Sequence, residues 1–132
     1  MAAVDTNILI RLLVRDDLAQ TALVTKLLSK TLAEQNTLFI PITVLLELDW
    51  VLRKSYQFDK TSRISVLNGL LNTIEFSIQS EAALESALHS FSHSNADFAD
   101  CLHACLAQHA GEIPLWTLDQ KAAKLNSAQL LF

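Results

Sequence analysis

Residues 95–107, NADFADCLHACLA, place two acids at the start of a run that is otherwise almost wholly apolar. Asp97 and Asp100 are three residues apart, so a helix would bring both carboxylates to one face. The alanines, leucines, cysteines and phenylalanine around them predict a buried helix over 96–110. A buried carboxylate is costly unless another group compensates its charge. Asn95 and Asp97 also suit a helix N-cap, so the carboxylate of Asp97 either binds a metal ion or caps the helix.

Short apolar segments alternate with amphipathic ones along the rest of the chain. The expected strands are 2–5, 38–42, 73–78 and 114–118, with a further edge strand over AQLLF, 128–132. The expected helices are 8–14, a second one from Asp16–Asp17 to Gln35, 43–55 capped by Thr43, 60–72 capped by Asp59, one from Ser80 to 92, 96–110 ending at Gly111, and a short one from Asp119. This alternation predicts an α/β sandwich with a mainly parallel sheet.

Composition narrows the class of protein. The chain has 132 residues, which fits a single domain over 1–132 with one core. It is 51% hydrophobic and 18% charged, which argues against disorder. Two glycines and two prolines leave no glycine-rich loop for phosphates or dinucleotides. No apolar run reaches membrane-spanning length, and Asp5 interrupts any signal peptide, so we expect a cytoplasmic protein.

The net charge argues against a generally basic nucleic-acid binder. Ten basic residues face 14 acidic ones, which gives −4. Removing the five acids Asp5, Glu47, Asp97, Asp100 and Asp119 leaves 10 basic residues against 9 acidic ones. The excess negative charge is therefore attributable to this one set.

These five acids all fall near the ends of expected strands or in the first turns of expected helices. Asp5 ends the first strand, and Asp119 follows the strand PLWTL. Sites in parallel α/β folds form beyond the carboxyl ends of the strands, so the five could converge there. A hard cation such as Mg²⁺ or Mn²⁺ would relieve their repulsion and would support phosphodiester hydrolysis. Asp119 is also a good N-cap for the residues that follow it.

Glu47 and Asp49 lie on the same expected helix. Leucines flank Glu47 on both sides, so we expect its side chain to face inward. Asp49 lies about 200° round that helix, so we expect it to be solvated.

Four stretches, in this order and spacing, resemble the PIN-domain family, and more narrowly the VapC-type toxin ribonucleases of bacterial toxin–antitoxin pairs. They are AVDTNILIRLLVRDD, PITVLLELDWVLR, NADFADCLHACLA and WTLDQKAAKL, and they extend over nearly the whole chain. The resemblance implies a PIN-like three-layer α/β/α sandwich and a Mg²⁺-dependent endoribonuclease, with Mn²⁺ as a substitute. It also implies a cognate antitoxin that holds the enzyme inactive, and commonly a homodimer.

The resemblance also implies roles for individual residues. The catalytic acids would be Asp5, Glu47, Asp100 and Asp119, and the metal ligands Asp5, Asp100 and Asp97. Asn7 and Thr117 match polar residues that line the site. Asp49 stands where the family usually has an apolar residue, a departure expected at the surface. RNA contacts would come from Arg11, Arg15, Lys121 and Lys124, which could equally be solvated helix faces.

Two other functions remain open from the sequence. Cys101, Cys105 and His109 share a helical face at i, i+4 and i+8, and His89 and His93 form another i, i+4 pair. Three ligands on one straight helix span too far for one zinc ion, so a zinc or thiol site would need a ligand from elsewhere. A PIN-fold module without activity could instead engage only a protein partner. The apolar surface Leu27, Leu28 and Leu32 is either a dimer interface or core.

Overall fold

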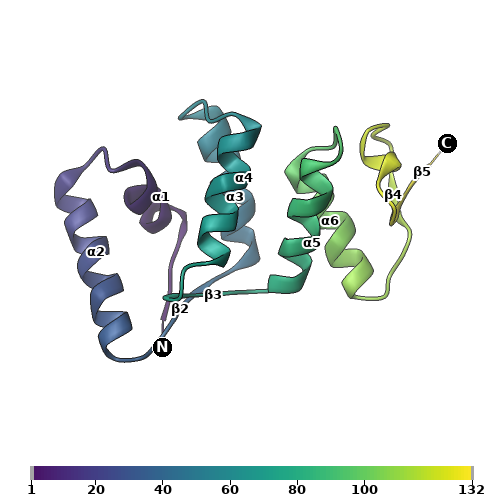
Figure 1. Cartoon of the computed structure of the whole chain (residues 1–132). Helices are drawn as coiled ribbons and strands as arrows, with labels where there is room; N and C mark the ends of the chain where they lie inside the picture. The colour runs from purple at the N-terminus through teal and green to yellow at the C-terminus, as the bar shows by residue number, and fades with distance from the viewer. Residues whose placement is uncertain (1, 132) are drawn as a thin grey trace. The chain divides into compact units, whose positions relative to one another are not determined.

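All the strand pairs in this computed structural model are parallel among the residues that it describes, 2–131. The chain divides into two compact units, residues 1–79 (unit 1) and 80–132 (unit 2). Each unit contains helices and one parallel sheet (Figure 1). The predicted α/β class with parallel pairing is confirmed. No helix in the described part of the chain is long and apolar enough to cross a membrane.

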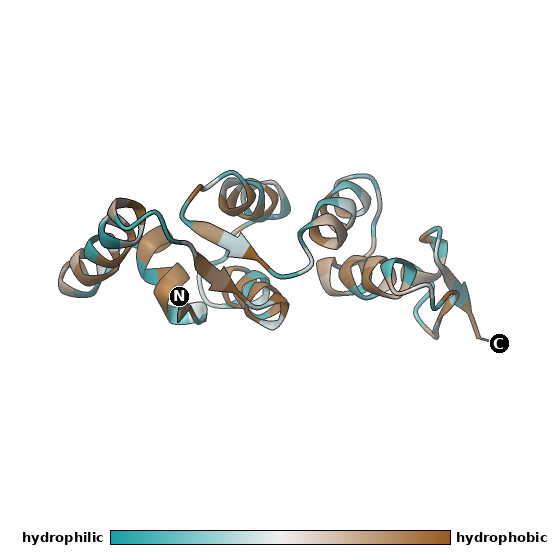
Figure 2. Cartoon of the chain, turned by 90° about the horizontal axis from the view of Figure 1, so that it is seen from below, coloured by the Kyte–Doolittle hydropathy of each residue, from teal (hydrophilic) through white to brown (hydrophobic). Residues whose placement is uncertain are grey.

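Unit 1 has a three-stranded sheet in the order β1-β2-β3, formed by Ala2–Ala3, Leu38–Ile40 and Phe76–Ile78. Two helices connect β1 to β2, and two connect β2 to β3, because parallel neighbours need long crossovers. These helices are α1 (Thr6–Val14), α2 (Leu18–Ala33), α3 (Ile42–Lys54) and α4 (Lys60–Leu71). The core contains Leu9, Ile40, Leu45, Leu48, Leu52 and Leu67, all fully buried. Apolar residues run along the strands, whereas the helices show both polar and apolar residues (Figure 2).

Unit 2 pairs two helices with a two-stranded sheet. Its elements are α5 (Glu81–Ser92), α6 (Phe98–His109), β4 (Leu115–Thr117), the 3₁₀ turn η1 (Ala122–Lys124) and β5 (Ala128–Leu130). The edge strand expected at the C-terminus is β5, which pairs with β4, while Phe132 lies outside the described residues. Helices α5 and α6 pack through apolar side chains, with the rings of Phe91 and Phe98 edge to face at 5.7 Å.

Local capping chemistry explains several helix boundaries. The side chains of Asp17 and Asp59 accept hydrogen bonds from the amides of Gln20 and Ser62, as N-caps do. Gly111 ends α6 with a positive φ of 75°, a conformation that glycine adopts without steric cost. The predicted N-caps at Asp17 and Asp59 and the predicted glycine stop are confirmed.

The N-terminus of α3 differs from the prediction. The strand β2 stops at Ile40, and Pro41 occupies the N-cap, so Thr43 lies within the first turn. The amide of Ile42 donates to the side-chain oxygen of Gln79, at 2.9 Å. A residue just past β3 therefore caps a helix that begins 37 residues earlier.

The prediction that Asp49 is solvated is wrong. Asp49 is 9% exposed and accepts a hydrogen bond from Nε of Arg63 at 2.8 Å, which also forms an ion pair. Arg63 lies on α4 and donates a second bond to the carbonyl of Phe58. Helix α3 contacts both α1 and α4, so two of its faces are covered and the acid lies on the second one.

Candidate active site

Asp5 lies at the carboxyl end of β1, as expected. The amide of the preceding residue, Val4, still donates to the carbonyl of Phe39 in the neighbouring strand. Asp5 is then the N-cap of α1, and its side chain accepts a hydrogen bond from the amide of Ile8 at 3.2 Å. The carboxylate is exposed and held at the edge of the sheet where parallel α/β folds form sites.

Glu47 is brought to the same edge of unit 1 by β2 and α3. Strands β1 and β2 are parallel neighbours, so the helices that follow them begin at the same edge. The hydroxyl of Thr6, buried in the first turn of α1, donates a short hydrogen bond to Glu47 Oε1. Glu47 itself is exposed, so the prediction that it faces inward is wrong.

Thr6 is the residue that the sequence reasoning missed. It lies between Asp5 and Asn7, two of the predicted site residues. Its hydroxyl donates to Glu47, so the residue next to Asp5 holds a second predicted catalytic acid. The signal was present in the triplet DTN, since a buried threonine needs a hydrogen-bond partner. Asn7 is exposed in the first turn of α1.

Three acids crowd together in unit 2. Asp97 occupies the N-cap position of α6 without a side-chain capping bond, and Asp100 follows in the first turn. Burial raises the pKa of Asp100, and the negative charges of Asp119 and Asp97 raise that pKa further, while His103 lowers it. The negative charges of Asp119 and Asp97 therefore act on the carboxyl group of Asp100.

The loop after β4 orients Asp119. Its amide donates to Thr117 Oγ1 at 3.0 Å, and its Oδ1 accepts from the amide of Ala122 at 2.8 Å. Asp119 therefore caps the turn that leads into η1, and Thr117 fixes the backbone just before it. The cap does not exclude a second role, because a carboxylate has two oxygens and about four lone-pair sites.

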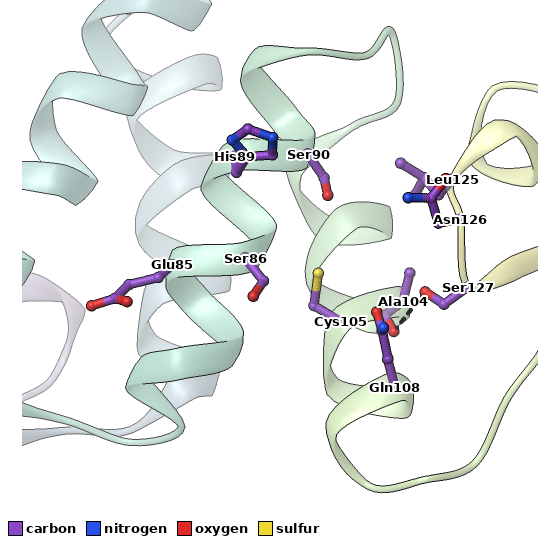
Figure 3. A pocket seen from close by; sticks show the side chains of 10 residues that line it. All are labelled: Glu85, Ser86, His89, Ser90, Ala104, Cys105, Gln108, Leu125, Asn126 and Ser127. Carbon is purple, nitrogen blue, oxygen red and sulfur yellow. Dashed lines mark hydrogen bonds between the residues drawn. The ribbon is translucent and has the colours of Figure 1, made fainter.

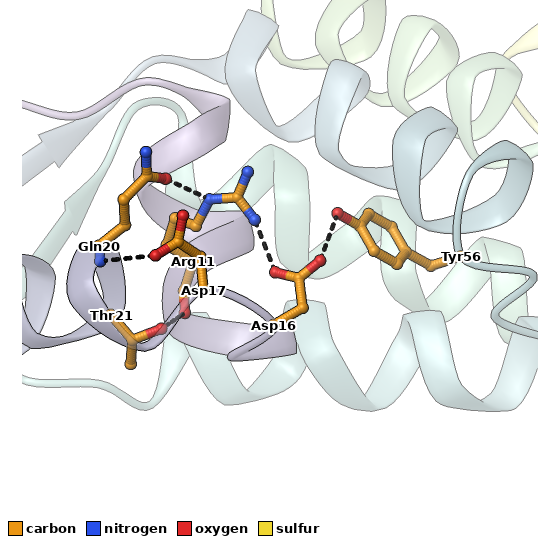
Figure 4. Close-up of polar contacts among 6 residues, drawn as sticks. All are labelled: Arg11, Asp16, Asp17, Gln20, Thr21 and Tyr56. Carbon is orange, nitrogen blue, oxygen red and sulfur yellow. Dashed lines mark hydrogen bonds and ion pairs between the residues drawn. The ribbon is translucent and has the colours of Figure 1, made fainter.

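The basic residues nominated for RNA contacts differ in their environments. Arg11 is engaged within unit 1: it pairs with Asp16 at 2.6 Å and donates to the side chain of Gln20 at 2.6 Å (Figure 4). Arg15 is exposed at the C-terminus of α1 in a left-handed conformation. Lys121 and Lys124 are exposed around η1 in unit 2.

The donor set of these acids fits a hard divalent cation. Carboxylate oxygens are the ligands that Mg²⁺ and Mn²⁺ prefer, and the pKa of Asp100 is raised by burial and then by the negative charges of Asp119 and Asp97. In the described chain, no three His, Cys, Asp or Glu side chains already form a group that could hold a metal ion.

The two cysteine thiols are less suitable metal ligands than the carboxylates. Cys101 and Cys105 are buried, at 0% and 5% exposure. Burial raises the pKa of the Cys105 thiol, whereas zinc binding requires the thiolate. Both cysteines fill the core beside α5, which supports a structural role rather than the zinc alternative with His109.

A family model described as "PIN domain" matches residues 2–127, which is nearly the entire chain. No curated protein matched the sequence. PIN domains are generally nucleases and typically use divalent metal ions. The helices and parallel sheets described above are consistent with the three-layer α/β/α class predicted from the sequence. The chain therefore belongs to the PIN domain family.

Proposed function

We propose that this PIN domain is a Mg²⁺-dependent endoribonuclease of the VapC type, a toxin that a cognate antitoxin neutralises. The proposal rests on two observations together: the match to the PIN domain family and the positions of the five acids. Asp5 and Glu47 lie at the carboxyl edge of one sheet, and Asp97, Asp100 and Asp119 crowd around the start of α6. Both sets of acids would serve the same reaction, the hydrolysis of an RNA phosphodiester.

In this proposal each acid has a distinct task. Asp5, Asp97 and Asp100 would be ligands of Mg²⁺ or Mn²⁺, because carboxylate oxygens suit these ions and the negative charges of Asp119 and Asp97 act on Asp100. The bound ion would polarise the phosphodiester and lower the pKa of a water nucleophile. Glu47 and Asp119 would orient that water and accept its proton, and Asn7 and Thr117 would fix the surrounding polar groups.

The partners of the chain follow from the same reading. The substrate would be RNA, with contacts from Arg15, Lys121 and Lys124. Arg11 would contribute the guanidinium N–H groups that do not bind Asp16 or Gln20. The protein would act in the cytoplasm and form a homodimer. Exposed leucines on α2, including Leu32 at 50%, support such an apolar interface.

A cleavage assay tests the proposal. Purified protein is incubated with a panel of labelled structured RNAs, with Mg²⁺, with Mn²⁺ and with EDTA. We expect cleavage only with metal, and a loss of at least about a hundredfold in Asp5→Asn and in Asp100→Asn, because losing a ligand should exceed the effect of losing a group behind one. Asp59→Asn is the matched control, since asparagine also caps a helix.

Two results would contradict the proposal. Metal-independent cleavage would remove the role of the carboxylates. Absence of cleavage of every RNA by folded protein, together with tight binding of a protein partner, would favour the alternative of a catalytically silent module.

A further inference from the structure

Unit 2 contains a groove between α5, α6 and the segment that follows η1. Its larger part is a cavity of about 380 Å³, bounded by residues of both helices and by 125–127 (Figure 3). Asp97, Asp100 and Asp119 do not line it, and none of the proposed catalytic acids does. The groove is therefore separate from the acids that the nuclease reaction would use.

Apolar side chains line one part of this larger cavity, and two amide side chains lie beside them. Ala104, Cys105 and Leu125 are buried and line the cavity. The raised pKa of Cys105 keeps its thiol neutral, which suits an apolar surface. Gln108 and Asn126 are exposed and project toward the same space from α6 and from the segment after η1 (Figure 3). Such amides form paired hydrogen bonds with the edges of nucleic-acid bases, and an apolar floor accepts a base face.

A second cavity of about 220 Å³ adjoins the first, and the two share His89, Ser90, Leu125 and Asn126. It adds the side chains of His93, Ser94 and Lys124, and no carboxylate is among its described lining residues. Lys124 therefore brings a positive charge to the second cavity, while Glu85 is the acid among the residues that line the first.

The two histidines of this second cavity are ordered by their own contacts. Nδ1 of His93 lies 2.8 Å from the backbone carbonyl of His89 and 2.9 Å from the hydroxyl of Ser92. A carbonyl oxygen only accepts, so Nδ1 donates, and Nε2 can donate to a phosphate oxygen when the ring carries both protons. The rings of His89 and His93 stack with centroids 4.3 Å apart. Lysine, imidazole, hydroxyl and amide groups together are the set that binds a phosphate.

We propose that this groove binds one nucleotide of the RNA, with the phosphate at Lys124 and His93 and the base between Gln108 and Asn126. The identity of the ligand as part of an RNA chain rests on the proposed ribonuclease function. The walls of the groove are continuous in sequence with the acids of unit 2: Ser94 precedes Asp97 by three residues, and Lys124 follows Asp119 by five. The nucleotide would therefore flank the phosphodiester that is cut, and the groove would contribute to the choice of cleavage site.

Binding without cleavage tests this inference. The protein is titrated in EDTA with adenosine 5′-monophosphate, cytidine 5′-monophosphate, adenosine and inorganic phosphate, and amide shifts are followed by NMR. We expect the mononucleotides to shift residues 89–94 and 124–127, and to bind more tightly than adenosine or phosphate alone. Lys124→Ala should weaken mononucleotide binding about tenfold or more, the cost of losing a hydrogen bond to a charged group. Asn126→Ala should weaken it less and change the preference between the two bases.

Matched control variants keep the binding test decisive. Lys26→Ala removes an exposed lysine from α2, and His109→Ala an exposed histidine from α6; both should bind mononucleotides as the unaltered protein does. Lys124, Asn126 and His93 are exposed, so their variants should fold. The inference is overturned if mononucleotides shift other residues or if Lys124→Ala binds them unchanged. Mononucleotide binding by a protein that cuts no RNA would contradict only the proposed function, and would leave this groove as a nucleotide site.

Discussion

The acids of unit 1 have donor partners, whereas three acids of unit 2 lie close to one another. Asp5 accepts from the amide of Ile8, Glu47 from the hydroxyl of Thr6, and Asp49 from the guanidinium of Arg63. Asp100 instead carries a raised pKa, which the neighbouring charges of Asp119 and Asp97 increase beyond the effect of burial. Repulsion between neighbouring carboxylates is therefore a feature of the acids around the start of α6. Removing an acid should destabilise unit 1 but stabilise unit 2 in the absence of metal.

The largest expected effect on stability is at the buried ion pair of unit 1. Asp49→Ala leaves Arg63 buried without its carboxylate, so the free energy of unfolding should fall by roughly 3–5 kcal/mol. Urea unfolding of the variant and of the unaltered protein measures this difference. The double variant Asp49→Leu with Arg63→Met should recover most of the loss, because a buried pair can be replaced by apolar side chains. An Asp49→Ala protein as stable as the original would show that the pair contributes nothing.

A smaller effect, on catalysis rather than folding, is expected at Thr6. Thr6→Val keeps the shape of the side chain but removes the hydroxyl that donates to Glu47, so the rate of metal-dependent RNA cleavage should fall roughly tenfold. Cleavage of a labelled RNA in Mg²⁺ measures this rate. Thr6→Ser should restore it, since serine keeps the donor. Equal cleavage rates in the valine and serine variants would mean that Thr6 only fills space.

The smallest effect is expected at a helix cap of unit 1. Hydrogen bonds from the backbone amide and side chain of Ser62 lower the pKa of Asp59. A lowered carboxylate pKa stabilises the folded state above the ordinary aspartate pKa of about 3.9, and this contribution is lost as the pH falls through the lowered value. Asp59→Ala should therefore lower the urea midpoint at pH 7 and converge on the unaltered protein in acid. A deficit that stays constant with pH would contradict this assignment.

The contrast between the units also shows what could be predicted from the sequence. The caps at Asp17, Asp59 and Gly111 follow from chemistry within four residues, and the alternation of segments is enough to predict the parallel α/β class. The contacts that the sequence could not predict join distant residues: Thr6 with Glu47 across 41 positions, Ile42 with Gln79 across 37, and Asp49 with Arg63 across 14. Hydrophobic periodicity identifies one buried face of a helix, so it missed the second face of α3. The catalytic roles of Asp5, Glu47, Asp100 and Asp119 stay predictions.

The central claim is that the crowded acids of unit 2 bind a divalent cation. Because the pKa of Asp100 is raised, its contribution to stability is present while it is protonated and is lost as the pH rises through that value. At neutral pH, Asp100→Asn should therefore raise the melting temperature in EDTA. Mn²⁺ at a hundredfold excess over its dissociation constant should stabilise the unaltered protein by about 2.7 kcal/mol, and Asp100→Asn by much less.

Thermal unfolding at neutral pH, with EDTA and with Mn²⁺, measures both effects in the unaltered protein, in Asp100→Asn and in the control Asp59→Asn. We predict that Asp100→Asn melts higher than the unaltered protein in EDTA and gains little from Mn²⁺, while Asp59→Asn gains as much as the unaltered protein. Equal Mn²⁺ shifts in all three proteins, or no shift in any, would contradict the account, because Asp100 would then not be a metal ligand.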